Sequence, residues 1–270
     1  MIINNLALIT VLYNNPQEEI YDWLKTLLQN FYYCPLYYFN VYLINNGEID
    51  YNFDEFQSIP NLNNYRLVYE KNENTGYCGG NNYASNFFQK DIYPKCVFII
   101  NPDLYIYNSL VFDWMFATTI KSNAITGIYQ DGYNWLTYPA MFPTDKKYDA
   151  EELPFVYNYN PKEKYPEQKW KSLPYIDGSL MCLPYSVYKL GFDTDFMPGY
   201  FGENALQFKA QLELNCKLIG VPIQKMIKHD SNSDEMYTPI LKQEWSKTAR
   251  NIFYTKYALP NYDYFLRLLV

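Results

Sequence analysis

The sequence predicts an α/β protein in which a mostly parallel central sheet is flanked by helices on both faces. Short apolar runs typical of buried strands alternate with helical segments, and this alternation is typical of parallel sheets. Three runs end in polar residues, at Tyr13-Asn14, Asn45-Asn46 and Asn101-x-Asp103. Ligands of such sheets bind at the carboxyl ends of the strands, so these residues are candidates for a site.

The first half of the chain is predicted to contain four strands. The first covers residues 6–13 and is followed by a helix whose first turn carries Pro16, Glu18 and Glu19. Further strands are expected over residues 38–44, 66–69 and 96–100, and a glycine-rich turn is expected to lead into a helix over residues 81–89.

The second half is less regular. Residues 129–174 mix Tyr, Pro, Lys and Glu without periodicity, which predicts a long surface loop of the kind that often covers a site. Beyond it we expect a strand over 179–183, an amphipathic helix over 203–218, a strand over 222–228 and a closing helix over 238–257. The 270 residues contain neither an internal repeat nor a disordered linker, so we expect one domain.

Charge and cysteine content exclude several classes of protein. The net charge is −7 and no basic run is present, so no nucleic-acid partner is expected. The five cysteines are odd in number and lack Cys-x-x-Cys spacing, which argues against a disulfide framework or a cysteine zinc site. No apolar stretch approaches the length of a transmembrane segment and no signal-peptide pattern is present, so we expect a cytoplasmic protein.

The glycine-rich segment does not fit the common phosphate-binding fingerprints. It has neither the G-x-G-x-x-G spacing of dinucleotide sites nor the G-K-[ST] ending of a P-loop. Gly76, Gly79 and Gly80 instead predict a tight entry into a helix at Asn81, with a purely structural turn as the alternative.

The segment Asn74-Thr75-Gly76-Tyr77-Cys78-Gly79-Gly80-Asn81-Asn82, followed by Asn101-Pro102-Asp103, resembles glycosyltransferase family 2 of the GT-A fold, in its rhamnosyltransferase-like branch. The resemblance continues in order through Tyr13-Asn14, Asn46-Gly47, Gly178-Ser179, Gly191-Phe192-Asp193, Tyr200-Phe201-Gly202-Glu203 and His229-Asp230-Ser231. It implies a GT-A (Rossmann-like) fold.

The resemblance also implies an activity. The protein would be an inverting hexosyltransferase of glycan or polysaccharide biosynthesis, which moves a sugar from a dTDP- or UDP-sugar to a saccharide acceptor, and rhamnose is the candidate sugar. Residues 1–128 would form the nucleotide-sugar-binding half, residues 129–258 the acceptor and catalytic half, and residues 259–270 a C-terminal tail.

Such a transfer needs a positive group to neutralise the leaving diphosphate. Mg²⁺ and Mn²⁺ prefer oxygen ligands, and Asp103, just past a predicted buried strand, is the candidate carboxylate. The alternative is that Asn101-Pro102-Asp103 is only a turn. By resemblance His229 is a second metal or diphosphate contact, although a lone histidine is equally compatible with a structural role.

The transfer also needs a base for the acceptor hydroxyl. By resemblance this base is Glu203, with Glu in place of the usual Asp and Ala205 at the family's next acidic position. Glu203 opens a predicted helix, whose dipole favours the ionised carboxylate, although Glu is common in first turns for structural reasons alone.

The resemblance also assigns a donor pocket, whose residues are Tyr13, Asn14, Asn46, Gly76, Gly80, Asn81 and Asn101. Asn101 replaces the first carboxylate of a D-x-D triplet.

Further residues have two interpretations each. Asp177, Asp193 and Asp195 are candidates for binding sugar hydroxyls or for capping loops. Aromatic residues of the long loop suit stacking against acceptor sugars, although the general abundance of Tyr explains most of them equally well. These aromatic residues are Tyr129, Tyr133, Trp135, Tyr138, Trp170 and Tyr175.

Two other functions were weighed. A sugar nucleotidyltransferase would need a basic, glycine-rich loop after the first strand, where this chain has Asn14-Asn15-Pro16. A non-catalytic relative that binds a saccharide or nucleotide sugar remains open, because Asn101, Glu203 and Ala205 depart from the commonest acidic pattern. Hydrolysis of the donor would separate an enzyme from such a binder.

Overall fold

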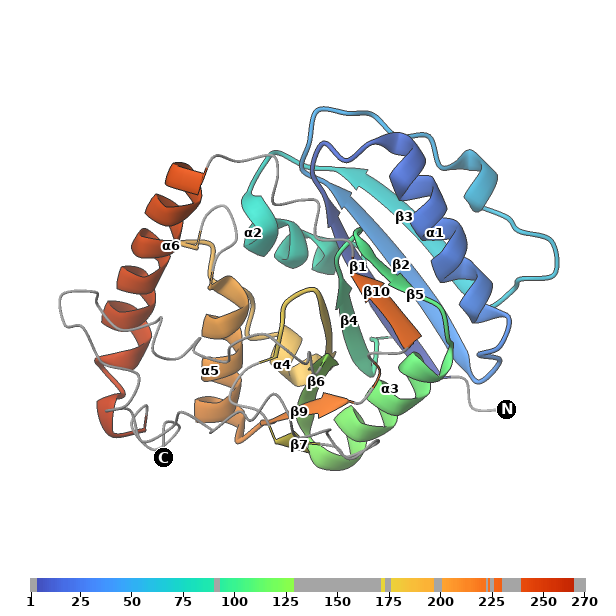
Figure 1. The fold of residues 1–270 in the computed structure, drawn as a ribbon. Helices are drawn as coiled ribbons and strands as arrows, with labels where there is room; N and C mark the ends of the chain where they lie inside the picture. Colours follow the sequence, from blue (N-terminus) through green and yellow to red (C-terminus); the bar gives the residue numbers. More distant parts are fainter. Residues whose placement is uncertain are drawn as a thin grey trace, which may run out of the picture.

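An eight-stranded sheet lies between two layers of helices (Figure 1). The computed structural model describes residues 4–89, 93–128, 171–172, 176–196, 201–221, 223, 226–229 and 239–264. The order of the strands is β3-β2-β1-β4-β8-β6-β9-β7, and all of them except β8 and β7 run in one direction. The predicted α/β class with a mostly parallel sheet is confirmed.

The elements have the following bounds. The sheet contains β1 (Asn4–Leu12), β2 (Tyr37–Asn45), β3 (Tyr65–Lys71), β4 (Cys96–Ile100), β6 (Ala124–Ile128), β7 (Lys171–Ser172), β8 (Leu180–Pro184) and β9 (Lys217–Val221), and a two-stranded sheet contains β5 (Leu104–Ile106) and β10 (Ile227–His229). The helices are α1 (Gln17–Phe31), α2 (Gly76–Tyr83), α3 (Leu110–Ser122), α4 (Tyr185–Tyr188), α5 (Gly202–Leu214) and α6 (Pro239–Phe253), with short 3-10 turns η1 (Asp54–Phe56) and η2 (Ala84–Phe87) and a π turn η6 (Tyr254–Ala258).

The strands are apolar throughout because both faces of the sheet are covered. In β1, Leu6 and Leu8 pack with α1 and α3, whereas Ala7 and Ile9 pack with α2, α4 and α5. Figure 1 shows α1 and α3 on one side of the sheet, and α6 outside α5 on the other. Each fully buried Leu or Ile contributes about 1.5–3 kcal/mol, so these two cores hold the strand ends, and the residues that follow them, in fixed positions.

The glycine-rich segment is not a turn before a helix, and this prediction is corrected. Helix α2 begins at Gly76, so the segment is itself helical up to Tyr83. Only Gly76 needs glycine for its backbone, with φ +66°. Gly80 is needed for space, because a Cβ there would lie 2.8 Å from Val11 Cγ1 on β1.

Two predicted boundaries in the second half are also wrong. The helix expected over residues 203–218 ends at Leu214, where Asn215 takes a left-handed φ of 48° and the chain turns into β9. The strand expected over 222–228 is β10, Ile227–His229, which pairs with β5. The expected long loop over 129–174 lies almost entirely outside the described residues, as do the six aromatic residues proposed for the acceptor.

All five cysteines are buried and free, in agreement with the absence of a predicted disulfide framework. Among the described helices, none has both the length and the apolar character that crossing a membrane requires.

Strand β5, which follows Asp103 directly, is attached to α1 by two buried hydrogen bonds. Trp23 Nε1 donates to the carbonyl oxygen of Leu104 at 2.9 Å, and Asn30 Nδ2 donates to that of Ile106 at 2.7 Å. A carbonyl buried in this way is costly to leave without a donor. Helix α1 therefore fixes the backbone next to Asp103.

We predict that Trp23→Phe lowers the free energy of unfolding by about 1–3 kcal/mol beyond its loss of packing, because the Leu104 carbonyl loses its buried donor. Urea denaturation followed by circular dichroism measures this. The control is Phe112→Leu, which shrinks a buried ring on the same face of the sheet without removing a hydrogen bond. Equal losses in the two variants would mean that the indole N–H contributes nothing.

Candidate functional site

The strand order reverses between β1 and β4, and this reversal marks the place where ligands bind in open α/β sheets. Tyr13 and Asn14 follow β1, and Asn101 and Asp103 follow β4. The four predicted residues therefore flank the crevice at the carboxyl ends of two neighbouring strands.

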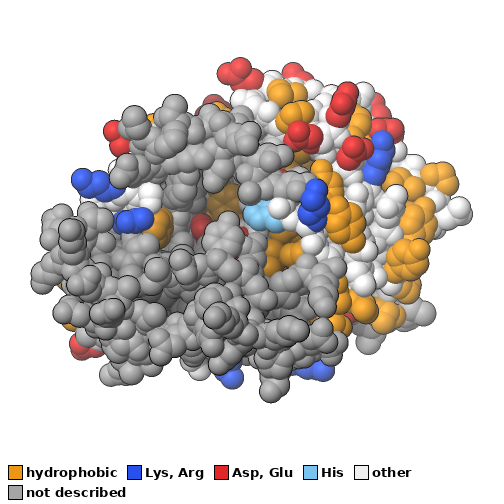
Figure 2. Space-filling model, viewed as in Figure 1, with side chains coloured by type: hydrophobic (Ala, Val, Ile, Leu, Met, Phe, Trp, Pro, Cys, Tyr) orange, Lys and Arg blue, Asp and Glu red, His pale blue; other side chains and the backbone are white. Residues whose placement is uncertain are grey.

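Asp103 and His229, the two residues that the resemblance proposes as metal ligands, lie next to each other in the structure. His229 Nε2 lies 3.4 Å from Asp103 Oδ1. The pairing of β10 with β5 places His229 opposite Leu104, the residue after Asp103. Both side chains are largely buried, and Figure 2 shows the only histidine of the chain at the edge of a hollow in the surface.

The donor set of this pair fits a divalent cation that also binds a substrate. The described residues contain no cluster of three or more His, Cys, Asp or Glu side chains that could hold a metal ion by themselves. Mg²⁺ and ions like it are commonly bound through one or two protein ligands together with substrate phosphates and water. One carboxylate and one imidazole from two different elements meet that requirement.

Glu203 lies in the first turn of α5 and packs against Gly178. A Cβ on Gly178 would lie 3.2 Å from Glu203 Cγ, so the absence of a side chain there makes room for the carboxylate arm. The Tyr77 phenol donates to the carbonyl oxygen of Gly178 at 3.0 Å. Burial, and after it the negative charge of Glu203, raise the pKa of Tyr77 well above its usual value, so the phenol stays protonated as a donor.

Strand β8 places Glu203 and Asp103 at the same edge of the sheet. It runs antiparallel to β4, with Leu180 opposite Ile100. The Asn101 N–H donates to the carbonyl oxygen of Ser179 at 2.9 Å. The Gly178-Ser179 segment that contacts Glu203 is thus hydrogen-bonded to the segment that carries Asp103.

Helices α2 and α5 touch at the start of α5. A Cβ on Gly202 would lie 2.1 Å from Cys78 Sγ, a separation that real atoms do not show. Phe201, just before the helix, has a left-handed φ of 65°, which is strained for a residue with a side chain. The backbone that carries Glu203 is therefore held by close packing on α2.

Asparagine side chains join the ends of β1, β2 and β3. Asn14 Oδ1 accepts from the Glu48 N–H at 2.7 Å, and Asn46 Nδ2 donates to the carbonyl oxygen of Gly76 at 2.8 Å. Asn72, after β3, donates to Asn46 Oδ1 at 3.3 Å and to Thr75 Oγ1 at 3.1 Å. Neutral amides thus supply both donors and acceptors along this edge.

The residues predicted for the donor pocket fall into two groups. Tyr13, Asn14 and Asn101 are partly exposed, and they are the ones that can touch a ligand in this structure. Asn46, Gly76, Gly80 and Asn81 are buried. Asn81 is fully buried, with Nδ2 donating to the Tyr77 carbonyl at 2.9 Å and its own carbonyl accepting from the Tyr188 hydroxyl, so it supports α2 from within.

Sequence reasoning did not single out Asn72, Tyr77 or Cys78. A signal for Asn72 was present. Asn14 follows β1, Asn45 ends β2 and Asn72 follows β3, so asparagine recurs at the ends of these three strands. Tyr77 and Cys78 matter only through contacts with residues more than a hundred positions away, and no local pattern indicates such contacts.

Two of the three further aspartates, Asp177 and Asp193, act as loop caps in the described structure. Asp177 Oδ1 accepts from the Ser179 N–H at 2.8 Å, and Asp193 Oδ1 accepts from the Asp195 N–H at 3.1 Å. The capping interpretation, which the sequence left open beside sugar binding, is therefore supported for Asp177 and Asp193.

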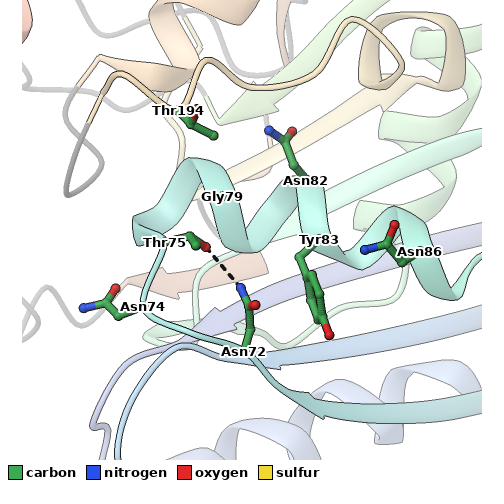
Figure 3. A pocket seen from close by; sticks show the side chains of 8 residues that line it. All are labelled: Asn72, Asn74, Thr75, Gly79, Asn82, Tyr83, Asn86 and Thr194. Atoms are coloured by element: carbon green, nitrogen blue, oxygen red, sulfur yellow. Dashed lines mark hydrogen bonds between the residues drawn. The ribbon is translucent and has the colours of Figure 1, made fainter.

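A cavity of about 600 Å³ lies along the outer face of α2 (Figure 3). Thr75, Gly79 and Asn82 recur on this face at helical spacing, and Asn72 closes one end through its bond to Thr75. The other lining residues are Asn74, Tyr83, Asn86 and Thr194. No lining residue carries a charge, so this cavity is a poor candidate for a diphosphate, and it contains none of the predicted catalytic or metal residues.

Comparisons with known proteins identify the fold. No protein-family model matches the chain. No curated protein matches it by sequence. Solved structures do match it: *Staphylococcus aureus* TarS 1-349 has 12% identity and a TM-score of 0.52, over 94% of this chain and 73% of that one. GalNAc-T7 with UDP, GalNAc and Mn²⁺ has 11% identity and a TM-score of 0.56, over 94% of this chain and 50% of that one.

A third structure agrees. The mannosyltransferase PcManGT from *Pyrobaculum calidifontis*, in complex with GDP-Man and Mn²⁺, has 15% identity and a TM-score of 0.50, over 80% of this chain and 54% of that one. The chain thus spans about half the length of PcManGT and GalNAc-T7. At these identities the matches show the fold alone, and that fold is the predicted GT-A, Rossmann-like one.

We predict that Gly202→Ala lowers the free energy of unfolding by about 1–3 kcal/mol, because the new methyl group overlaps Cys78 Sγ. Adding Cys78→Ala removes the overlapping atom, and the double variant should lose less than the sum of the two single variants. A double-mutant cycle by urea denaturation measures the coupling, expected at about 0.5–3 kcal/mol. Strict additivity would contradict the contact between α2 and α5.

Proposed function

We propose that this protein is a glycosyltransferase that moves a sugar from a nucleoside diphosphate sugar to a saccharide acceptor with inversion at the anomeric carbon. The observation that carries the proposal is the Asp103–His229 pair, 3.4 Å apart at the reversal of strand order in a GT-A fold. Support comes from structures of the same fold: TarS 1-349 in complex with UDP-GlcNAc, and PcManGT with GDP-Man and Mn²⁺.

The donor is proposed to bind in the half formed by residues 1–128. Tyr13 and Asn14 would contact its nucleotide, with Asn46, Gly76, Gly80 and Asn81 holding the pocket in shape. A dTDP- or UDP-sugar is proposed from the resemblance to glycosyltransferase family 2, and the neutral amides of this edge offer both donors and acceptors to its base. A rhamnose donor follows from the resemblance of the chain to the rhamnosyltransferase-like branch of glycosyltransferase family 2.

Asp103 and His229 would hold a divalent cation, Mn²⁺ or Mg²⁺. When bound, such a cation supplies the positive charge that stabilises the leaving diphosphate. Asn101 lies where a D-x-D triplet of glycosyltransferase family 2 has its first carboxylate, so Asp103 would be the only carboxylate of this triplet available to the cation. Oxygens of the diphosphate would supply further ligands.

Glu203 would act as the general base. Its carboxylate takes the proton of the acceptor hydroxyl while that oxygen bonds to the anomeric carbon and the bond to the diphosphate oxygen breaks on the opposite face. The first turn of α5 favours the charged carboxylate. Asp177 is the alternative base, and one of its oxygens accepts from the Ser179 N–H.

The acceptor is proposed to bind in the half formed by residues 129–258, with residues 259–270 as a tail. The biological setting that we propose is glycan or polysaccharide synthesis in the cytoplasm. Free, buried cysteines agree with a reducing compartment.

The first test is a thermal-shift panel of UDP, TDP, GDP and CMP with and without Mn²⁺. A nucleotide at about 100 times its dissociation constant stabilises the folded state by roughly 2.7 kcal/mol. We expect at least one diphosphate to raise the Tm in wild type, more strongly with Mn²⁺. Asp103→Ala should lose the Mn²⁺-dependent part and most transfer.

The matched control is Asp22→Ala, which removes an exposed carboxylate from α1. This variant should keep the full Mn²⁺ response. Failure of every nucleotide to shift the wild type would contradict the proposed function as a whole, whereas an unchanged Mn²⁺ response in Asp103→Ala would contradict only the assignment of the cation ligand.

The second test is Glu203→Gln, which keeps the size of the side chain but removes its basicity. We expect nucleotide affinity and Tm close to wild type, and transfer slower by roughly a hundredfold or more. Calorimetry and single-turnover transfer measure these on one preparation, and the exposed Glu213→Gln on the same helix is the control. Normal transfer by Glu203→Gln would show that another group is the base, and joint loss of binding and stability would show a structural role.

A further inference from the structure

A group of polar side chains ties the end of helix α6 to the loop before helix α5. The Lys256 ammonium lies 2.7 Å from Asp193 Oδ2 and 2.7 Å from Asp195 Oδ2. The Tyr257 phenol donates to the same Asp193 oxygen. Asp193 is well shielded, with 11% of its side chain exposed, whereas Asp195 is 61% exposed, so the contact with Asp193 is the stronger of the two.

One end of this contact lies on a helical turn, and the other lies in the loop. Lys256 and Tyr257 belong to the π turn η6, a conformation that is rare and often found at functional sites. The Tyr257 ring also packs against Phe253 and Phe196, with centroids 5.8 and 6.2 Å away. The end of α6 therefore contacts the loop through charge, through a hydrogen bond and through apolar packing.

The described part of this loop, residues 191–196, contacts the residue before Glu203. Phe196 is fully buried, and its Cβ lies 3.7 Å from the position that a Cβ on Gly202 would take. The start of the loop is fixed to α2, because the Asn82 amide accepts from the Phe192 N–H at 2.8 Å and donates to its carbonyl at 2.7 Å. The loop thus connects α2, the end of α6 and the start of α5.

The contacts of Asp193, rather than its charge, argue against a role as base. Burial raises the pKa of its carboxyl, but the hydrogen bonds from Lys256 and Tyr257 and the positive charge of Lys256 outweigh burial, so the pKa lies below its usual value. The carboxylate is therefore ionised at neutral pH and occupied by its partners.

We propose that Asp193, Lys256 and Tyr257 form a latch that positions Glu203, and that these three are positioning residues for the transfer reaction. The kinetic part of this inference rests on the proposed function, and the part about packing does not. The latch holds Phe196 against Gly202, and Gly202 against Cys78, which fixes the direction in which the Glu203 carboxylate points. A displacement of about 1 Å at a reacting group costs on the order of a hundredfold in rate, so a weakened latch should lower turnover without changing donor binding.

Lys256→Met tests the latch because it removes the ammonium and leaves the ring of Tyr257 in place. We expect kcat to fall by about tenfold or more, with KM for the donor and the nucleotide-induced shift in Tm near wild type. Lys256→Arg should restore most of kcat, since the guanidinium also reaches a carboxylate. Lys247→Met, an exposed lysine of α6, is the control and should leave kcat unchanged.

A second readout does not depend on catalysis. Cys78 is buried beside Gly202, so its thiol should react with a maleimide faster when the latch is open, as measured by mass spectrometry of the native protein. Cys34, buried on the other face of the sheet, is the internal control. Burial and, to a lesser degree, the negative charge of Asp193 raise the pKa of the Cys78 thiol, and this charge remains in Lys256→Met. A faster reaction of Cys78 alone therefore reports exposure of the contact between α2 and α5 and not a more reactive thiol.

The outcomes are distinct. Lower kcat together with faster labelling of Cys78 supports the latch. Unchanged kcat and unchanged labelling overturn it. A lower Tm with normal kcat and uniform labelling of all cysteines would show a purely structural ion pair, and this outcome also overturns the latch. A wild type that transfers no sugar contradicts the proposed function, and the labelling result then still decides whether the latch holds α5 in place.

Discussion

The close approach of helix α2 to its neighbours is the constraint on which the rest of the site depends. Gly80 lets the helix lie against Val11 of β1, and Gly202 lets the start of α5 lie against Cys78. A side chain at Gly80 would push α2 away from β1, and one at Gly202 would push α5 away from α2, because packed interiors have no spare volume. With α2 at this distance, the Gly76 carbonyl reaches the Asn46 amide and the Tyr77 hydroxyl reaches Gly178.

Neutral groups build the edge of the sheet, and charges occur at few points on it. Amides of Asn14, Asn46 and Asn72 satisfy backbone groups at the strand ends without the desolvation cost of a buried charge. Asp103 and Glu203 are the two carboxylates of this edge that the proposed function uses, and each is held by its own contacts. In the proposed function these two carboxylates have separate tasks, Asp103 for the cation and Glu203 for the proton.

Local sequence was sufficient for β1, β2, β4 and α1, because each is a continuous apolar or periodic run with polar residues at its end. It failed where tertiary contacts decide. The glycines of α2 were interpreted as a turn, although the helix starts five residues before Asn81, and this shift turns the Asn81 side chain inward. Strands β5 and β10 are short and pair across distant parts of the chain, so no local pattern predicts them. The pairing of Asp103 with His229 was accessible only through the resemblance to a known family.

The two halves of the chain complete each other's part of the site. Asp103 belongs to the first half, but its partner His229 comes from β10 in the second. Glu203 belongs to the second half, but α2 of the first half supports it through Tyr77 and Cys78. Strand β8 of the second half also pairs directly with β4 of the first. A cut between the halves would therefore divide one sheet and remove a contact from each proposed catalytic group, so the site can form only when the whole sheet has formed.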